Sequence, residues 1–238
     1  MTPTIGSLFS GIGGLELGLE AAIPGARVSW QVEQDEFCRG ILAKHWPEAG
    51  RFEDVRTVGA ANLEPVDIIC GGFPCQDISV AGRGGGLAGE RSGLWWEFAR
   101  IVRELAPRVI VVENVSALTN RGLDAVLGEM AAGGYNAEWD IISAASVGAW
   151  HRRERLFVVA HTNHPGRSEQ RGASASQAQQ SPLERHSGWT TEPGMGRVAN
   201  GVPNRVAKLR ALGNAVVPQC AYIVGQRVAA LLGGKVGH

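Results

Sequence analysis

The chain has 238 residues, of which 44% are hydrophobic, and its 23 basic and 23 acidic residues give a formal net charge of zero. This length suits one large domain, with or without a small appended region. The neutral total excludes a protein that binds nucleic acid through overall charge, so any basic surface must be local. We find no signal peptide and no apolar run long enough to span a bilayer, so we expect a cytoplasmic protein without membrane contact.

The cysteines and histidines give no sign of a disulfide framework or a metal site. The four cysteines lie far apart and form no C-x-x-C pair: Cys38, Cys70, Cys75 and Cys220. Reduced thiols are the expectation for such spacing in a cytoplasmic protein. The histidines show no ligand spacing with the cysteines, so we expect no zinc or other metal.

The chain begins with a strand, a glycine turn and a helix. Residues 4–9 are predicted to form the strand, Ser10 to Gly14 the turn, and residues 15–22 the helix. This arrangement lets backbone amides and a helix N-terminus approach a polar ligand. Residues 28–32 form the next predicted strand, which ends at Glu33, an acid placed where it could accept hydrogen bonds from a ribose.

A thiol follows the next buried strand. A helix is predicted over 35–46, with Asp35 as its N-cap and Pro47 after its end, and residues 52–55 are predicted to end a third strand. The apolar run 66–70 is predicted to be a buried strand, and it leads into Pro74, Cys75 and a glycine-rich loop. Reactive groups are commonly placed on loops held by a rigid scaffold.

The second half of the sheet carries a carboxylate and a cationic cluster. A helix is predicted over 94–105, and the β-branched run 109–112 predicts a central strand covered on both faces, with Glu113 at its tip. A carboxylate in that place is costly unless it is solvated or has a task. The remaining elements are a helix over 123–132 and strands over 135–143 and 155–160, with the cationic cluster at 151–155.

The alternation of strands and helices predicts an α/β, doubly wound sheet. Ligands in such folds bind beyond the carboxyl ends of the strands, where the glycine turn, Glu33, Cys75 and Glu113 all fall. We therefore expect one shared site there.

Composition changes between residues 163 and 204, where aliphatic residues are few and Ser, Gln, Arg and Gly are frequent. Such composition is typical of a loop-like or partly disordered segment. Helical patterns return at 205–212 and 219–232. We expect one domain made of residues 1–162 and 205–238, with the end of the chain adding a helix to its first part.

Several short motifs occur in a definite order along the chain. They are Phe9-Ser10-Gly11-Ile12-Gly13-Gly14, Glu33, Asp54, Pro74-Cys75-Gln76, Glu113-Asn114-Val115, Arg153 with Arg155, and Gly213-Asn214-Ala215-Val216. This set resembles the motifs of the cytosine-C5 DNA methyltransferase family of bacterial or phage type, which uses S-adenosylmethionine. The resemblance covers residues 4–160 and 205–232, most of the chain.

The resemblance implies a Rossmann-like methyltransferase sheet with a small, reduced target-recognition region at 163–204. It implies a monomer that acts on double-stranded DNA and flips the target base out of the stack. The catalytic residues implied are Cys75, Glu113, Arg153 and Arg155, and the DNA contacts are Gln76, Ser79, Arg83 and Arg91. The cofactor-binding residues implied are Phe9, Ser10, Gly11, Gly13, Gly14, Leu15, Glu33, Gln34, Asp54, Val55, Pro74, Leu94, Asn214 and Val216.

The chemistry of cytosine methylation gives each catalytic residue a task. Carbon 5 of cytosine is a poor nucleophile until a thiolate, here Cys75, adds at carbon 6. Glu113 would share a proton with ring N3, which requires a carboxyl of raised proton affinity. Arg155 and Arg153 would hold the base carbonyl through charge-assisted hydrogen bonds.

The sequence departs from the family pattern in three places. Ala149-Trp150-His151 replaces the usual Val-Pro-Gln, Gln34 replaces a common aromatic residue, and only 42 positions, 163–204, are available for target recognition.

The reduced region leaves two alternatives open, tRNA cytosine-C5 methylation and a catalytically impaired cofactor- or DNA-binding regulator. A nicotinamide dehydrogenase is disfavoured because the glycine turn lacks the third spaced glycine. The biological setting, as part of a restriction-modification system, in phage protection or as an orphan enzyme, is left open by the sequence.

Overall fold

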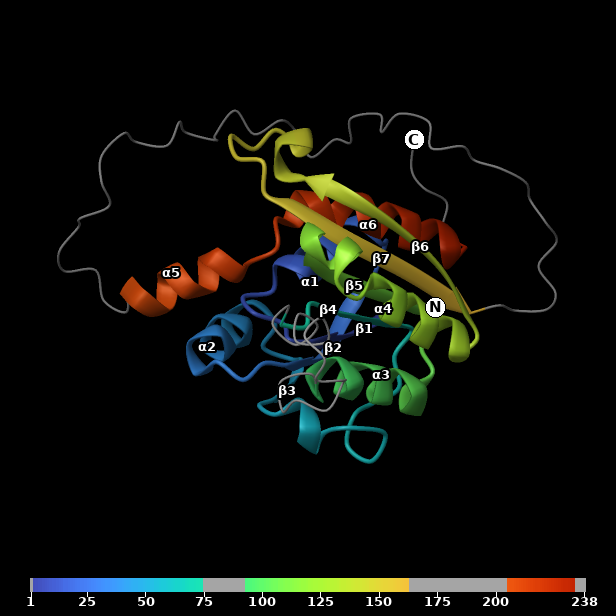
Figure 1. Ribbon diagram of the computed structural model, residues 1–238. Helices are drawn as coiled ribbons and strands as arrows, with labels where there is room; N and C mark the ends of the chain where they lie inside the picture. The colour runs from blue at the N-terminus through green and yellow to red at the C-terminus, as the bar shows by residue number, and fades with distance from the viewer. Residues whose placement is uncertain (1, 75–92, 163–204, 234–238) are drawn as a thin grey trace.

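The computed structural model describes residues 2–74, 93–162 and 205–233. They contain a seven-stranded sheet in the order β3-β2-β1-β4-β5-β7-β6 (Figure 1). Strands β1 to β5 pair in parallel, while β7 runs antiparallel to both β5 and β6. The strands are β1 Thr4–Leu8, β2 Arg27–Val32, β3 Gly50–Phe52, β4 Ile68–Gly71, β5 Val109–Val115, β6 Tyr135–Ser143 and β7 Glu154–Thr162.

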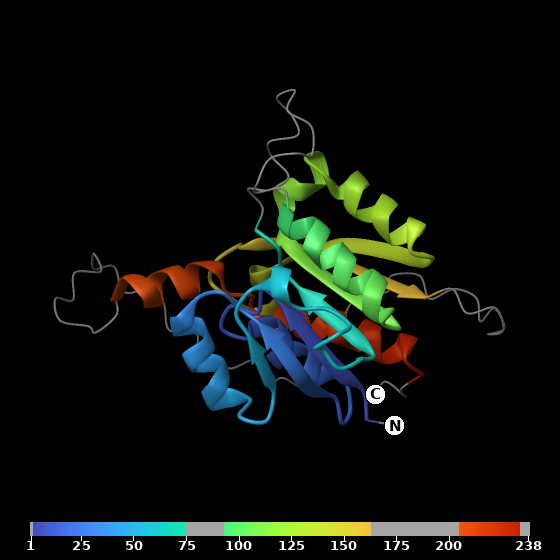
Figure 2. The ribbon, with the colours of Figure 1, turned by 90° about the horizontal axis from the view of Figure 1, so that it is seen from below.

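Helices cover both faces of the sheet. The helices are α1 Gly14–Ala22, α2 Glu36–His45, α3 Gly93–Leu105, α4 Leu123–Ala132, α5 Arg205–Asn214 and α6 Pro218–Leu231. One apolar cluster joins the sheet to α3 and α4, and a second joins it to α1 and α6. Figure 2 shows α3 and α4 on one side of the sheet and α6 on the other. The prediction of an α/β, doubly wound sheet is therefore confirmed.

Helices α1 and α6 pack closely although they come from opposite ends of the chain. A Cβ added at Gly225 would lie 2.6 Å from the Cβ of Ala22, and one added at Gly18 would overlap Ala221. Glycine at both positions lets the two backbones approach, which no larger residue would allow. The packing places the start of α6, and the segment just before it, beside the glycine turn that precedes α1.

Most helix boundaries predicted from the sequence agree with those in the structure. The side chain of Asp35 accepts a hydrogen bond from the amide of Cys38 and caps α2, and Pro218 occupies the first turn of α6. Three elements differ clearly from the prediction. The strand predicted to end over 52–55 is β3 Gly50–Phe52, because Asp54 caps a 3-10 helix that begins at Val55. Strand β5 continues through Glu113 to Val115 because β7 pairs along its whole length, and α5 continues to Asn214. Glu113 is thus inside a strand rather than at its tip.

Candidate active site

The strand order changes direction between β1 and β4. A cavity lies at the carboxyl ends of β1, β2, β4 and β5. Its volume is about 720 Å³, within the usual range for small-molecule sites. Such a switch point is where ligands bind in doubly wound folds. Most of the residues predicted to bind a cofactor line it: Phe9, Ser10, Gly11, Gly14, Leu15, Glu33, Gln34, Asp54, Val55, Pro74, Leu94, Asn214 and Val216. Gly13 is not among the lining residues.

Glu33 is held rigidly on the cavity wall. Its Oε2 accepts a hydrogen bond from the amide of Gly11 at 2.7 Å, and its Oε1 accepts one from the amide of Asp35 at 2.7 Å. The carboxylate therefore joins the glycine turn after β1 to the start of α2. Because each carboxylate oxygen has two lone pairs, both oxygens retain acceptor capacity for a ligand hydroxyl.

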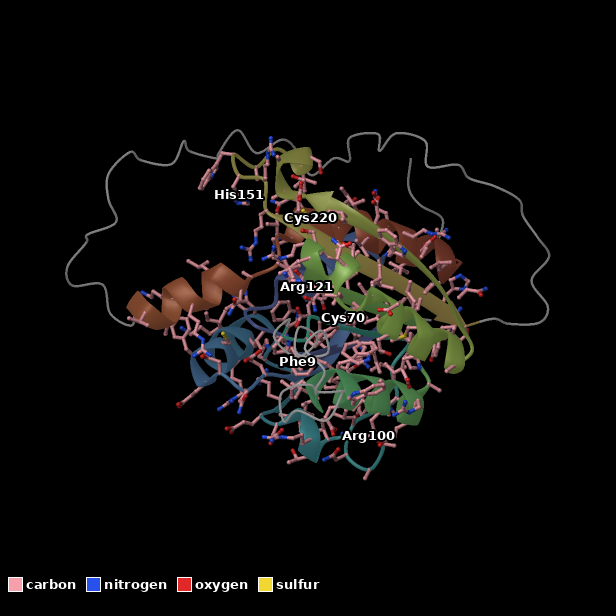
Figure 3. The ribbon with its side chains drawn as sticks, viewed as in Figure 1. Phe9, Cys70, Arg100, Arg121, His151 and Cys220 are labelled. Carbon is pink, nitrogen blue, oxygen red and sulfur yellow. The ribbon has the colours of Figure 1, made fainter. Side chains whose placement is uncertain are left out.

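The glycine turn adopts backbone conformations that suit close approach to a ligand. Gly11 and Gly13 have φ of 57° and 85°. Phe9, just before the turn, has φ 57°, which is uncommon for an aromatic residue and is a form of strain concentrated at functional sites. Figure 3 shows Phe9 and Cys70 near the centre of the molecule, where β1 and β4 end.

The end of α5 and the segment between α5 and α6 form another wall of the cavity. Asn214, Ala215 and Val216 line it. A Cβ at Gly14 would overlap the carbonyl oxygen of Val216, so the first residue of α1 must be glycine for this wall to pack as it does.

Glu113 and Arg155 form an ion pair on the cavity wall. Arg155 Nε lies 3.0 Å from Glu113 Oε1, and only 10% of the Glu113 side chain is exposed. Burial raises the pKa of Glu113 to about 7, although Arg155 and Arg153 oppose this rise. A carboxyl with that pKa can both hold and release a proton near neutral pH.

Two neighbours fix Glu113 and the chain that leads to Pro74. A Cβ at Gly72 would lie 2.6 Å from Glu113 Oε2, so glycine leaves the room that the carboxylate occupies. Asn114 donates a hydrogen bond from Nδ2 to the carbonyl oxygen of Phe73 at 3.0 Å. This bond ties β5 to the backbone just before Pro74. Cys75, like the predicted DNA contacts Gln76, Ser79, Arg83 and Arg91, lies outside the described residues.

Arg153 has different partners from Arg155. Its Nη2 donates hydrogen bonds to the carbonyl oxygens of Gly213 at 2.8 Å and Ala215 at 2.6 Å. Burial lowers the pKa of Arg153, and the positive charge of Arg155 adds to this effect. Arg153 is not among the residues that line the cavity, whereas Arg155 is.

Asp54 is engaged by its own neighbour. Its two oxygens accept hydrogen bonds from Nε and Nη2 of Arg56, at 2.9 to 3.2 Å, and Oδ1 also accepts one from the Arg56 amide. These bonds lower the pKa of Asp54. The carboxylate lines the cavity, as predicted, but it is not a free acceptor.

Sequence reasoning missed a buried carboxyl beneath the glycine turn. Glu16 is fully buried on α1 and lines the cavity together with Ser7. Burial raises the pKa of Glu16, and its Oε2 accepts no hydrogen bond from any described residue. The only signal in the sequence is an acid two residues after the turn, on a helix face that is otherwise apolar.

Two other kinds of site are missing from the described residues. Within these ranges, no group of three or more His, Cys, Asp and Glu side chains is placed to hold a metal ion. No described helix has the length and apolar composition needed to cross a bilayer.

Comparison with curated proteins finds Type II methyltransferases. M.AquIA of Picosynechococcus sp. is 35% identical over 176 residues, a match that covers 65% of this chain and 70% of that protein. M.HhaI of Haemophilus parahaemolyticus is 31% identical over 160 residues, covering 66% of this chain and 48% of that protein. The match thus spans about half the length of M.HhaI.

Solved structures share the architecture. A candidate DNA modification methyltransferase encoded within an E. coli prophage aligns with a TM-score of 0.54 and 29% identity, covering 67% of this chain and 47% of that one. A Spodoptera frugiperda DNMT2 mutant aligns with a TM-score of 0.60 at 18% identity, over 72% of this chain and 54% of that one, and shows the fold alone. The family profile described as C-5 cytosine-specific DNA methylase matches residues 4–193. This chain belongs to the C-5 cytosine-specific DNA methylase family.

Proposed function

We propose that this protein transfers a methyl group from S-adenosylmethionine to carbon 5 of a flipped-out cytosine in duplex DNA. The observation that carries the proposal is the ion pair of Glu113 and Arg155, whose carboxyl has a pKa of about 7. The pair lies on the same cavity as Glu33 and beside the backbone that leads to Pro74 and Cys75. One site would thus combine an acid that can protonate a nucleobase with a wall that can bind a nucleoside.

The cavity suits S-adenosylmethionine. Its volume of about 720 Å³ is ample for a ligand of that size, and the anchored carboxylate of Glu33 offers acceptors to a ribose. Bound S-adenosylmethionine would supply the electrophilic methyl group of a sulfonium. The proposed binding residues are those predicted from the sequence: Phe9, Ser10, Gly11, Gly13, Gly14, Leu15, Glu33, Gln34, Asp54, Val55, Pro74, Leu94, Asn214 and Val216.

In the proposed reaction, Cys75 is the nucleophile. Its thiolate adds to carbon 6 of cytosine and the electrons move to carbon 5. Carbon 5 takes the methyl group as the bond between that group and the sulfonium sulfur breaks, so a neutral thioether would leave. A base then removes the carbon-5 proton, the bond between carbon 6 and the Cys75 sulfur breaks to release the thiolate, and N3 returns its proton to Glu113. No described residue is assigned to that last proton transfer.

Glu113 would protonate N3 as the thiolate adds, so that charge does not build up on the ring. Arg155 would hold the base carbonyl while keeping Glu113 in place, because its guanidinium has several donors and the ion pair uses Nε. Asn114 would keep the Pro74 backbone fixed relative to both, through its hydrogen bond to Phe73.

We also propose a division of the chain. Residues 1–162 and 205–238 would form the catalytic unit and residues 163–204 a reduced target-recognition region. The DNA contacts would come from that region and from Gln76, Ser79, Arg83 and Arg91, and the place of action would be the cytoplasm of a bacterial cell. The curated relatives are named as Type II methyltransferases, and no structural observation favours tRNA as the substrate.

Covalent trapping tests the proposal. Duplex DNA with 5-fluorocytosine at target sites should form a stable adduct with the wild-type protein in the presence of S-adenosylmethionine, since the fluorine cannot leave as a proton does. Cys75→Ser should form none, and Cys70→Ala, which changes a buried cysteine of β4 that does not line the cavity, should still react. Bisulfite sequencing of DNA from cells expressing the protein would then identify the methylated sequence. An unmethylated genome together with no adduct would refute the proposed activity.

A further inference from the structure

Arg153 connects two parts of the protein that lie far apart in the sequence. Its guanidinium bonds to the carbonyl oxygens of Gly213 and Ala215, which are 60 and 62 positions further along the chain. Both bonds come from the same nitrogen, at 2.8 and 2.6 Å. Hydrogen bonds from a charged donor are stronger than those between neutral groups.

The backbone of Arg153 is held in an uncommon conformation to make this connection. Its φ is 29°, in the positive region that residues with a side chain rarely adopt. The residue before it is anchored, because the carbonyl oxygen of Arg152 accepts hydrogen bonds from Ser143 Oγ at 2.7 Å and from the Ala144 amide at 2.8 Å. Strained residues of this kind persist where the surrounding structure fixes them, often as part of a site.

The segment that Arg153 holds is a wall of the cofactor cavity. Ala215 and Val216 line the cavity, and the Val216 carbonyl packs against Gly14 at the start of α1. The wall is thus bounded by Gly14 on one side and by Arg153 on the other. Two residues beyond Arg153, Arg155 pairs with Glu113.

We propose that Arg153 is a positioning residue that fixes the C-terminal wall of the cofactor cavity. The inference rests on the proposed function. It assigns the two arginines different tasks: Arg155 contacts the target base, and Arg153 acts through the backbone at 213–215.

Calorimetric titration of S-adenosylmethionine without DNA tests the link directly. Arg153→Ala should weaken cofactor affinity about tenfold or more, because the wall loses two charge-assisted hydrogen bonds. Arg153→Lys, which keeps the charge but not the planar fork, should fall between Arg153→Ala and wild type. Arg152→Ala removes an exposed arginine one position away and should bind as wild type does. Added guanidinium at millimolar concentration should restore part of the affinity of Arg153→Ala, a rescue that general structural damage would not allow.

Adduct formation with 5-fluorocytosine DNA separates the two arginines. At saturating S-adenosylmethionine, Arg153→Ala should form adduct at close to the wild-type rate, whereas Arg155→Ala should not. Unchanged cofactor affinity in both Arg153 variants would overturn the inference while leaving the proposed function standing. So would a loss of adduct in Arg153→Ala that saturating cofactor does not restore, since that is the behaviour of a base contact. A wild-type protein that binds no S-adenosylmethionine would instead refute the proposed function, and the inference with it.

Discussion

Replacement of Glu113 by glutamine removes the proton that we assign to N3 while keeping the shape of the side chain. The glutamine oxygen can still accept from Arg155, which now lies 3.0 Å from the carboxylate. Gly72 leaves the same room for the amide as for the carboxyl. The substitution therefore tests acid chemistry more than packing.

The size of the effect follows from the pKa. An ordinary glutamic acid of pKa 4.5 is protonated in about one molecule in 300 at pH 7, whereas a carboxyl of pKa about 7 is protonated in about half. Positioned acids contribute typically 10²- to 10⁴-fold to a rate. We expect Glu113→Gln to lower kcat by about that range with a much smaller change in the affinity for S-adenosylmethionine.

Methyl transfer to duplex DNA, followed with tritiated S-adenosylmethionine across pH 5.5 to 9, is the assay. The wild-type rate should fall on the alkaline side with an apparent pKa near 7, because the acid form of Glu113 is the active one. Glu113→Gln should lack that fall. The matched control is Glu138→Gln. Glu138 lies on the edge strand β6, and the substitution alters its exposed ion pair with Arg227 of α6. A variant with the wild-type rate, or with the same alkaline limb, would refute the assignment.

The same pKa predicts how stability depends on pH. Between pH 4.5 and about 7 the folded protein holds a proton on Glu113 that the unfolded chain has released. Its stabilising effect is complete below pH 4.5 and is lost as pH rises through about 7. The full interval corresponds to at most roughly 3 kcal/mol. Urea unfolding at pH 5.5 and 8 should therefore show a smaller difference for Glu113→Gln than for wild type, and equal differences would contradict the burial argument.

Three further substitutions test the cavity walls. Glu33→Ala should weaken S-adenosylmethionine binding at least tenfold by calorimetry, because an anchored pair of acceptors is lost. The control Glu48→Ala, which changes an exposed acid that does not line the cavity, should bind as wild type does, and an unchanged affinity in Glu33→Ala would remove Glu33 from the cofactor site. Gly72→Ala should lower the methylation rate at saturating cofactor, because its Cβ would displace Glu113, and full activity would show that this carboxylate can move. Asn114→Ala should cost about 1–3 kcal/mol of unfolding free energy, since the buried Phe73 carbonyl loses its partner; a stability equal to wild type in urea would contradict this.

Much of the fold could be predicted because local signals agree with the tertiary structure. The β-branched run at 109–112, the cap at Asp35 and the stop at Pro47 each indicate one element without reference to distant residues. The end of β5 could not be predicted in this way. Glu113 is paired with Phe157 in β7, and only that distant strand extends β5 past the apolar run. An acid after such a run looks like a strand end until its partner is known.

The candidate site shows the same division between local and distant information. The cavity-lining positions of Glu33 and Gln34 follow from their place after β2, which chain order alone suggests. Asp54 and Arg56 are only two positions apart, so a pairing between them was conceivable from the sequence. Nothing in the sequence, however, distinguishes this pairing from other arrangements of the two side chains. The raised pKa of Glu113 depends on burial by elements from across the chain, which motif positions do not report.

The two arginines at 153 and 155 show why spacing can mislead. Residues two apart on a strand point to the same face, so the sequence gives both the same partner. Strand β7, however, begins at Glu154, and the positive φ of Arg153 turns the backbone just before it. Arg155 continues in register opposite Val115 and reaches Glu113, while Arg153 reaches the carbonyls of the C-terminal segment. One residue in a left-handed conformation thus divides a paired motif between the proposed base site and the wall of the cofactor cavity.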